Sequence, residues 1–464
     1  MVTVVPALVL AVVAGIVVRA DSAGLLHLAL DPTALLWAVL GLGLLWLLWV
    51  TLIWLTYVRH RSHGASLPLR LAGSVGVLLM CAVVSAPMAV GARYAVVQRD
   101  LISTVFAGEQ SATAPTVTAD NPWGHRKRVN VLLLGGDGAV HRPGVRTDSV
   151  ILASIDTRTG STVLFGLPRN LRDVPFKPGS KLAALYPDGF TDGSTTPNAN
   201  YFLNAVYRDV PLLHPGVLGR SDNEGADAVK LAVSGALGLR VDYYVLANFS
   251  GFQSLVDAIG GITVNINEPV PIGGNTDAHI PPDSYLQPGP AQRLNGFKAL
   301  WYTRGRYGST DYKRMERQRC AIKAIVDEAS PVTVLKRYAK LAGAGKDIVR
   351  TDIPGKLLPA FVDLAGKVKG RPLQSVSFER SDEFDPNAPD FDYVRAAVQA
   401  ALAPGPSGGH AAAPASTTTG EPVPASGGAP AAGGLAGTSD VAPSKVSDAA
   451  DDCAYRPAAA SAAG

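Results

Sequence analysis

Residues 129–136 read VNVLLLGG, residues 149–157 read SVILASIDT and residues 161–169 read STVLFGLPR. Each run is rich in branched apolar residues and ends at glycine, threonine or proline, a pattern typical of buried strands. The turn sequence DTRTG joins the second run to the third, which indicates a hairpin. These runs therefore predict the centre of a β-sheet.

Helical and extended patterns alternate after these strands. Helical spacing occurs at 226–238, 251–261, about 311–343 and 395–403, and strand patterns occur at 241–250 and 261–267. Because hairpin-joined and crossover-joined strands both occur, the fold class predicted for residues 129–402 is α/β with a mixed central sheet.

The composition divides the chain into a membrane part and an aqueous part. Of the 464 residues, 47 % are hydrophobic and only 17 % are charged, and the apolar excess lies in the first 95 residues. The net charge of +4 is small, and the sequence has no helix-turn-helix or zinc-finger spacing. We therefore expect no nucleic-acid partner.

Three apolar runs, at about 2–18, 33–58 and 71–92, are candidate transmembrane helices. The first is shorter, and a signal peptide is its alternative interpretation. The loop from Arg59 to Arg70 carries three arginines and no acid. The positive-inside rule therefore predicts a cytoplasmic N-terminus and an extracytoplasmic domain after Arg93.

Two segments outside the predicted domain are polar or biased in composition. Residues 94–128 form a threonine- and alanine-rich connector that ends in NPWGHRKR, whose basic cluster is a solvated or headgroup-facing surface. Residues 403–464 consist largely of Ala, Gly, Pro, Ser and Thr. Such a segment buries too little apolar surface to offset its ordering entropy, so we predict a disordered tail.

The three cysteines match no metal-binding spacing. Cys81 lies in an apolar run and acts as a small hydrophobic residue. Cys320 and Cys453 lie in the part predicted to be outside the cell, where thiols oxidise. They are a candidate disulfide, and two free thiols are the alternative.

Two aspartates are candidate metal ligands. Asp137 follows the first strand in LLLGGD, and Asp148 lies in VRTDSV just before the second, two residues after Arg146. Ligands of α/β sheets bind beyond the carboxyl ends of strands, and Mg²⁺ prefers oxygen ligands. Taken alone, each aspartate is more often a loop-capping residue.

Arginines accompany these aspartates and favour an anion site. Arg169 ends the third strand, and Arg314, Arg317 and Gln318 share one face of a helix by their spacing. Guanidinium groups clamp phosphate with two parallel hydrogen bonds. Taken alone, an arginine-rich helix is more often a solvated face. The segment from residue 301 to 320 holds Arg304, Arg306, Arg314, Arg317 and Arg319.

The motifs NVLLLGGD, VRTDSVILASID, GLPRN, LNAVY, NFSGFQSLVDAIGGITVNI, LNGFKALWYTRGR and DYKRMERQRC occur in this order within residues 129–330. In this combination they resemble the LytR-CpsA-Psr family of cell-wall glycopolymer ligases. The PIGG segment and RYGSTDYKRMERQRC are similar to its actinobacterial branch. Two departures are Asn170, where the family often has aspartate, and three predicted spans in place of one.

The resemblance implies a mixed sheet sandwiched by helices and a hydrophobic tunnel for a polyprenyl chain. It implies that Asp137 and Asp148 hold Mg²⁺ or Mn²⁺. It also implies a set of pyrophosphate-binding residues, namely Arg146, Arg169, Arg304, Arg306, Arg314 and Gln318.

The expected activity is transfer of a glycan phosphate from a polyprenyl-pyrophosphate carrier to peptidoglycan. Such a reaction needs positioning and charge neutralisation more than covalent catalysis. The alternatives are a polyprenyl-pyrophosphate pyrophosphatase and a lipid-binding membrane regulator that attenuates transcription. The expected partners are the lipid-linked glycan, the peptidoglycan acceptor and the membrane.

Overall fold

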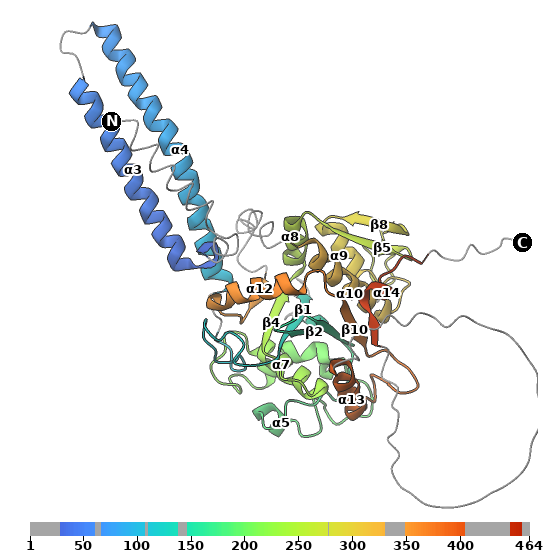
Figure 1. Cartoon of the computed structure of the whole chain (residues 1–464). Coiled ribbons are helices and arrows are strands. Elements are labelled where there is room, and N and C mark those ends of the chain that lie inside the picture. Colours follow the sequence, from blue (N-terminus) through green and yellow to red (C-terminus); the bar gives the residue numbers. More distant parts are fainter. Residues whose placement is uncertain are drawn as a thin grey trace, which may run out of the picture.

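A seven-stranded mixed sheet forms the centre of the domain (Figure 1). The structure is a computed structural model that describes residues 28–60, 66–106, 110–137, 146–276, 278–329, 349–403 and 446–456. In spatial order the strands are β11 (Val446–Asp448), β10 (Leu373–Ser377), β3 (Thr162–Leu167), β2 (Arg146–Asp156), β1 (Arg128–Asp137), β4 (Tyr243–Ala247) and β9 (Val349–Thr351).

Strand β1 is antiparallel to the central strand β2 and parallel to β4, and β3 is parallel to β10. Alternate side chains of a strand point to opposite faces of the sheet. Leu132 and Leu134 accordingly pack into one core, whereas Val129 and Val131 pack into another. Burial on both faces explains why this strand is an unbroken apolar run.

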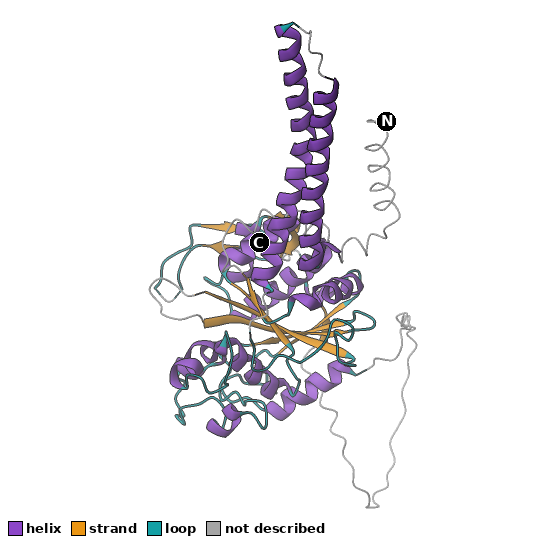
Figure 2. Ribbon diagram, turned by 90° about the vertical axis from the view of Figure 1, so that its left-hand side faces the viewer, coloured by secondary structure: helices purple, strands orange, loops and turns teal. Residues whose placement is uncertain are grey.

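Helices cover both faces of the sheet, as Figure 2 shows with the strands between two helical layers. The core around Leu132 is shared with α6 (Val206–Leu213), α7 (Glu224–Leu237) and α13 (Phe391–Leu402). The opposite face is covered by α12 (Leu358–Val368) and α10 (Asp311–Glu328). The predicted mixed sheet sandwiched by helices is therefore confirmed.

A smaller unit with its own core adjoins the sheet. It contains α8 (Phe249–Ile259), α9 (Gly296–Arg304), and the strand pairs β5 (Ile262–Ile266) with β8 (Gly289–Leu294) and β6 (Val270–Ile272) with β7 (Ser284–Leu286). Helix α10 packs into this core and also against the sheet. The shared helix α10 therefore connects the two cores.

Two long apolar helices, α3 (Pro32–His60) and α4 (Leu67–Val105), pair beside the domain (Figure 1). Each contains a segment long and apolar enough to cross a membrane, Pro32–Arg59 and Leu71–Asp100. The indole Nε1 of Trp46 donates to Ser85 Oγ at 2.8 Å between the helices. These helices contain the predicted spans 33–58 and 71–92, whereas the run 2–18 lies outside the described residues.

The end of α4 is built into the domain. Ile102 is buried, and the carbonyl of Phe106 accepts a hydrogen bond from Gly355 N at 3.2 Å. The connector after residue 109 is held by Asp227 of α7, which accepts from Ser111 Oγ at 2.5 Å and from two further groups of residues 112 and 113. Residues 94–105 of the predicted connector are thus helical, and residues 111–113 are held against the domain.

Residues 446–456 correct the prediction of a disordered tail over 403–464. Strand β11 pairs with β10, and α14 (Ala449–Asp452) buries Ala449 against the sheet. The structure joins Cys320 of α10 to Cys453, with Cα atoms 5.5 Å apart. Averaged composition hides such a short segment, which gains its order by docking onto an existing sheet edge. Residues 404–445 and 457–464 lie outside the described residues.

Candidate functional site

Asp148 lies within β2 at a β-bulge, not before the strand as its sequence context suggested. In the ladder with β1, Gly135 faces Ser149 and Gly136 faces Thr147, so Asp148 is the extra residue. A bulge interrupts the alternation of side chains and aims one of them in a new direction. Here it places a carboxylate beside the end of β1.

Two donors hold one oxygen of Asp148. Arg169 Nη1 lies 2.9 Å and Asn204 Nδ2 3.2 Å from its Oδ1. Burial favours the protonated form, but the charge and hydrogen bond of Arg169 outweigh it and lower the pKa of Asp148. The side chain is still 44 % exposed, so this ionised carboxylate is accessible to a ligand.

Arg169 bridges Asp148 to the helix α10. Its Nε donates to Asp311 Oδ2 at 3.1 Å. Burial lowers the pKa of the guanidinium, whereas the two carboxylates raise it, and the net direction is upward. The Arg169 carbonyl accepts from Asn204 N at 3.0 Å, which fixes both residues against each other.

Arg314 extends the network into the protein interior. It is 4 % exposed, and its Nη2 lies 3.0 Å from Asp311 Oδ2 and 3.2 Å from the carbonyl of Asp148. Burial lowers its pKa to about 10, so it stays protonated at neutral pH. Its Nε is buried and has no hydrogen-bond partner among the described residues. A buried donor without a partner is costly unless a ligand satisfies it, which favours an anion here.

The other predicted arginines and the glutamine lie around this network rather than in it. Arg146 donates to the carbonyl of Ala199 at 3.1 Å and to Asn200 Oδ1 at 2.8 Å. The Arg304 guanidinium stacks 4.2 Å from the ring centre of Phe249 and 5.2 Å from that of Trp301.

Arg306 and Gln318 also lie outside the hydrogen-bonded network. Burial is the main cause of the lowered pKa of Arg314, and the charge of Arg306 contributes to it. Gln318 Nε2 donates to the carbonyl of Thr303 at 3.2 Å. Gln318 and Asp148 line one hollow together with Ser149, Val150, Ile151, Gly166, Leu167, Met315 and Arg319.

Sequence reasoning missed Asp311 and Asn204, although both lie in motifs that carry the family resemblance. The spacing of Asp311 and Arg314 at i and i+3 was a usable signal for an ion pair on a helix. Asn204 carried no signal, because its contact with Asp148 depends on folding. Arg317 has a structural role, since its Nε donates to the carbonyl of Tyr302 at 2.8 Å.

One carboxylate oxygen at this site is open to a further partner. Asp148 is ionised, and among the described residues only its Oδ1 accepts hydrogen bonds, which leaves Oδ2 for another partner. The backbone of Asp137 faces Arg146 across the ladder, while its side chain lies outside the described part of the chain. In the described ranges, this site included, no group of three or more His, Cys, Asp or Glu could hold a metal.

The class of protein is defined by a mixed α/β sheet, an arginine–aspartate network at its strand ends and two helices long and apolar enough to cross a membrane. The model of the LytR_cpsA_psr family matches residues 101–400. The match covers more than half of the chain, and the chain therefore belongs to this family.

Several characterised relatives share this region. Biofilm regulatory protein A of Streptococcus mutans is 29 % identical over 259 residues, which are 54 % of this chain and 55 % of the relative. The polyisoprenyl-teichoic acid–peptidoglycan teichoic acid transferase TagV of Bacillus subtilis is 25 % identical over 286 residues, 59 % of this chain and 64 % of TagV. The chain thus spans less than two thirds of either relative.

Solved structures of the family are also similar to this chain. The crystal structure of B. subtilis TagV is 25 % identical, with a TM-score of 0.42, and the match covers 60 % of this chain and 99 % of the crystallised TagV chain. The structure of TagT bound to LIIa-WTA is 20 % identical, with a TM-score of 0.40, over 64 % and 98 % of the two chains.

Proposed function

We propose that this chain is a phosphotransferase that moves a glycan phosphate from a polyprenyl-pyrophosphate carrier onto peptidoglycan. The observation that carries the proposal is the Asp148–Arg169–Asp311–Arg314 network with its unpartnered buried donor. Family membership and the TagU and TagV relatives, named as teichoic acid transferases, support the substrate class.

In the proposed reaction, a peptidoglycan hydroxyl oxygen attacks the phosphorus attached to the sugar. The new P–O bond forms as the bond to the bridging oxygen breaks, polyprenyl phosphate leaves, and the hydroxyl proton passes to solvent. Arg169 and Arg314 bind and orient the pyrophosphate through their guanidinium donors. Arg146, Arg304, Arg306 and Gln318 surround it, and the positive charges of the three arginines stabilise the negative charge that develops in the transition state.

Asp137 and Asp148 would hold Mg²⁺ or Mn²⁺, which supplies neutralisation of the pyrophosphate charge. The role of Asp148 follows from its accessible, ionised carboxylate. The same proposal includes a tunnel for the polyprenyl chain, an extracytoplasmic domain with a cytoplasmic N-terminus, and membership of the actinobacterial branch.

The test is incubation of the purified chain with a lipid-pyrophosphate sugar and Mg²⁺, with and without a peptidoglycan acceptor. Release of polyprenyl phosphate only when acceptor is present, together with labelled peptidoglycan, is the expected result. Equal release without acceptor identifies a pyrophosphatase instead. Binding of the lipid without any release identifies a lipid-binding regulator.

A further inference from the structure

A second concentration of positive charge lies at the opposite end of the central strands from the candidate site. It consists of five exposed cations, which we call the basic platform: Lys127, Arg158, Lys367, Lys369 and Arg371. Lys127 precedes β1 and Arg158 follows β2, whereas Asp137 and Asp148 lie at the other ends of these strands. Since β1 has 10 residues, the two regions are about 30 Å apart.

Backbone contacts and one side-chain hydrogen bond bring the three segments of the basic platform together. Thr157 N donates to the carbonyl of Lys127 at 2.9 Å, and Lys367 Nζ donates to the carbonyl of Thr157 at 3.0 Å. Gly160 packs so closely on the backbone of Lys367 that a Cβ atom would lie 2.4 Å from its carbonyl carbon. Residues distant in sequence thus form one fixed surface.

Within the described part of the chain, these charges are not neutralised by ion pairs. Among the described residues, no carboxylate lies within salt-bridge distance of the five cations. The nearby carboxylate of Asp156 accepts hydrogen bonds from its own turn, including Thr159 N at 2.7 Å. Asp363, one turn before Lys367 on α12, offsets a single charge. The basic platform therefore keeps a net positive charge.

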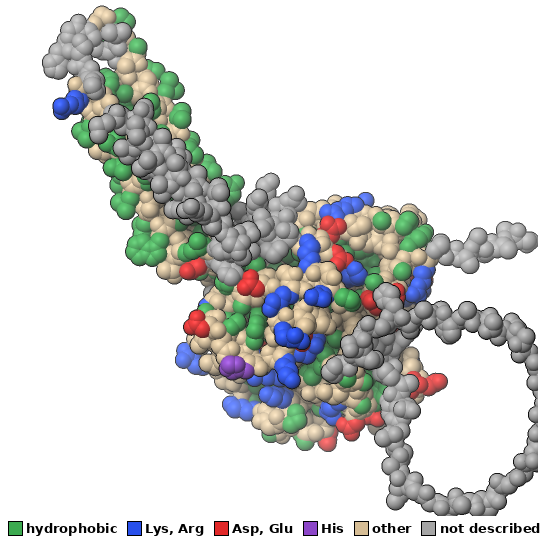
Figure 3. All heavy atoms as spheres, viewed as in Figure 1, with side chains coloured by type: hydrophobic (Ala, Val, Ile, Leu, Met, Phe, Trp, Pro, Cys, Tyr) green, Lys and Arg blue, Asp and Glu red, His purple; other side chains and the backbone are tan. Residues whose placement is uncertain are grey.

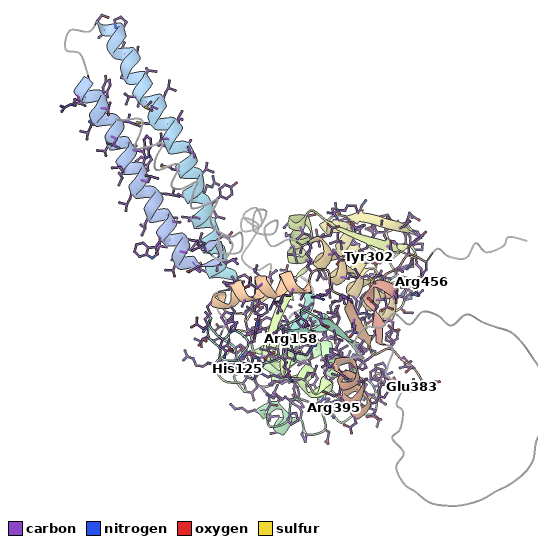
Figure 4. The ribbon with its side chains drawn as sticks, viewed as in Figure 1. His125, Arg158, Tyr302, Glu383, Arg395 and Arg456 are labelled. Carbon is purple, nitrogen blue, oxygen red and sulfur yellow. A yellow bond between two sulfur atoms is a disulfide. The ribbon has the colours of Figure 1, made fainter. Side chains whose placement is uncertain are left out.

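The basic platform adjoins the membrane anchor. Trp123, in the segment leading to Lys127, packs edge-on against Phe361 of α12 with ring centres 5.1 Å apart. Phe106, at the end of α4, packs into the same small core. Figure 3 shows lysine and arginine side chains gathered on this face, and Figure 4 places Arg158 and His125 beneath α12.

We propose that the basic platform binds anionic phospholipid headgroups of the membrane in which α3 and α4 are anchored, and so holds the domain against the membrane surface. Charge complementarity and continuity with the end of α4 favour lipid over a soluble polyanion. A basic side chain near an anionic membrane contributes about 1 kcal/mol, or roughly five-fold in the docking equilibrium. This inference does not depend on the proposed enzymatic activity.

The test uses the full chain in nanodiscs of phosphatidylcholine alone or with about a third phosphatidylglycerol. Hydrogen exchange is measured in residues 123–128 and 365–371. We expect slower exchange in the anionic discs, and loss of this difference at about 0.5 M salt, where the Debye length is short.

The double variant Lys367→Gln/Lys369→Gln should weaken docking about 25-fold and abolish the difference between the two lipids. The matched control Lys177→Gln/Lys181→Gln removes the same number of charges near α5 (Lys181–Leu185). In this control the difference in exchange between the two lipids should remain. Hydrogen exchange equal to that of wild type in phosphatidylcholine discs verifies that each variant is folded. Equal wild-type exchange in both discs overturns the proposal. Protection by soluble poly(glycerol phosphate) but not by anionic lipid also overturns it, in favour of a polymer site.

Discussion

Asp148 combines an ionised carboxylate with a position on a β-bulge, where its side chain supports no core packing. Asp148→Asn keeps its size but removes the charge. We expect transfer to fall about 100- to 1000-fold, comparable to the loss of one electrostatic contact in other active sites. Single-turnover transfer measures this loss, with the exposed Asp382→Asn as control. Near-normal turnover of Asp148→Asn would remove the metal assignment.

Arg169 uses two different nitrogens for two carboxylates, Nη1 for Asp148 and Nε for Asp311. Arg169→Lys keeps a positive charge but cannot make both contacts in the same plane. We predict about ten-fold weaker binding of the lipid pyrophosphate, measured by titration calorimetry in detergent. The control is Arg172→Lys, because Arg172 contacts only backbone carbonyls among the described residues. Equal affinities of wild type and Arg169→Lys would assign Arg169 a purely structural role.

How far the site could be predicted depends on the kind of contact. Asp148, Arg169 and Arg314 have side chains whose chemistry is evident from sequence, and the structure brings them together. The bulge at Asp148 was not predictable, because it arises from pairing with a strand separated by a loop. The role of Asn204 likewise depends on its contact with Asp148, which lies 56 positions away in the sequence.

Helix α7 is fastened to the sheet by a buried ion pair. Lys230 Nζ lies 2.6 Å from Asp352 Oδ2, and both residues are 1 % exposed. Lys230→Met leaves this carboxylate buried without a cation, which costs about 3–5 kcal/mol of unfolding free energy. The double variant Lys230→Met/Asp352→Asn should recover part of this loss, because the uncompensated charge is gone. Chemical denaturation measures both, and equal stabilities of the single and double variants would contradict the assignment.

The Lys230–Asp352 ion pair predicts that the free energy of unfolding depends on pH. Burial raises the pKa of Asp352, and the charge of Lys230 partly offsets this. A carboxyl with a raised folded-state pKa favours folding at low pH, and this benefit disappears as pH rises through that pKa. Lys230→Met raises the pKa further. Its deficit in stability relative to wild type should therefore be smaller near pH 5 than near pH 8, as denaturation at the two values would reveal.

The docked segment 446–456 depends on a covalent connection, because β11 has only three residues and α14 four. Cys453→Ser removes its bond to α10. The amides of 446–456 should then exchange on the order of 100-fold faster, since a disulfide typically contributes 2–4 kcal/mol. Strands β1 to β3 serve as the internal reference. Unchanged exchange in this segment would show that noncovalent contacts suffice.

The long elements were predictable, and the short ones were not. The runs that became β1, β2 and β3 carry enough apolar residues to define a strand by themselves. A three-residue strand such as β11 has no periodicity to detect, and its order comes from pairing with β10. Sequence patterns therefore located the sheet centre but not its edge.

At the scale of the molecule, the two apolar helices and the arginine-rich loop between them predict the topology. In a Cys81→Ala background, Ser66→Cys should resist a membrane-impermeant maleimide in intact cells, whereas Ser381→Cys should react. Both should react after the membrane is opened. Labelling of Ser66→Cys in intact cells would reverse the predicted orientation.

The firm junction between α4 and the domain determines how far the protein can act from the membrane. Ile102 and Phe106 pack into the domain, so its distance from the bilayer is not set by a flexible linker. A folded domain of this size is about 50 Å across. If the chain is the proposed membrane-bound transferase, it would search for its acceptor by lateral diffusion in two dimensions. Only wall strands within about one domain diameter of the bilayer would be within its reach, which would confine attachment to the innermost layer of the wall.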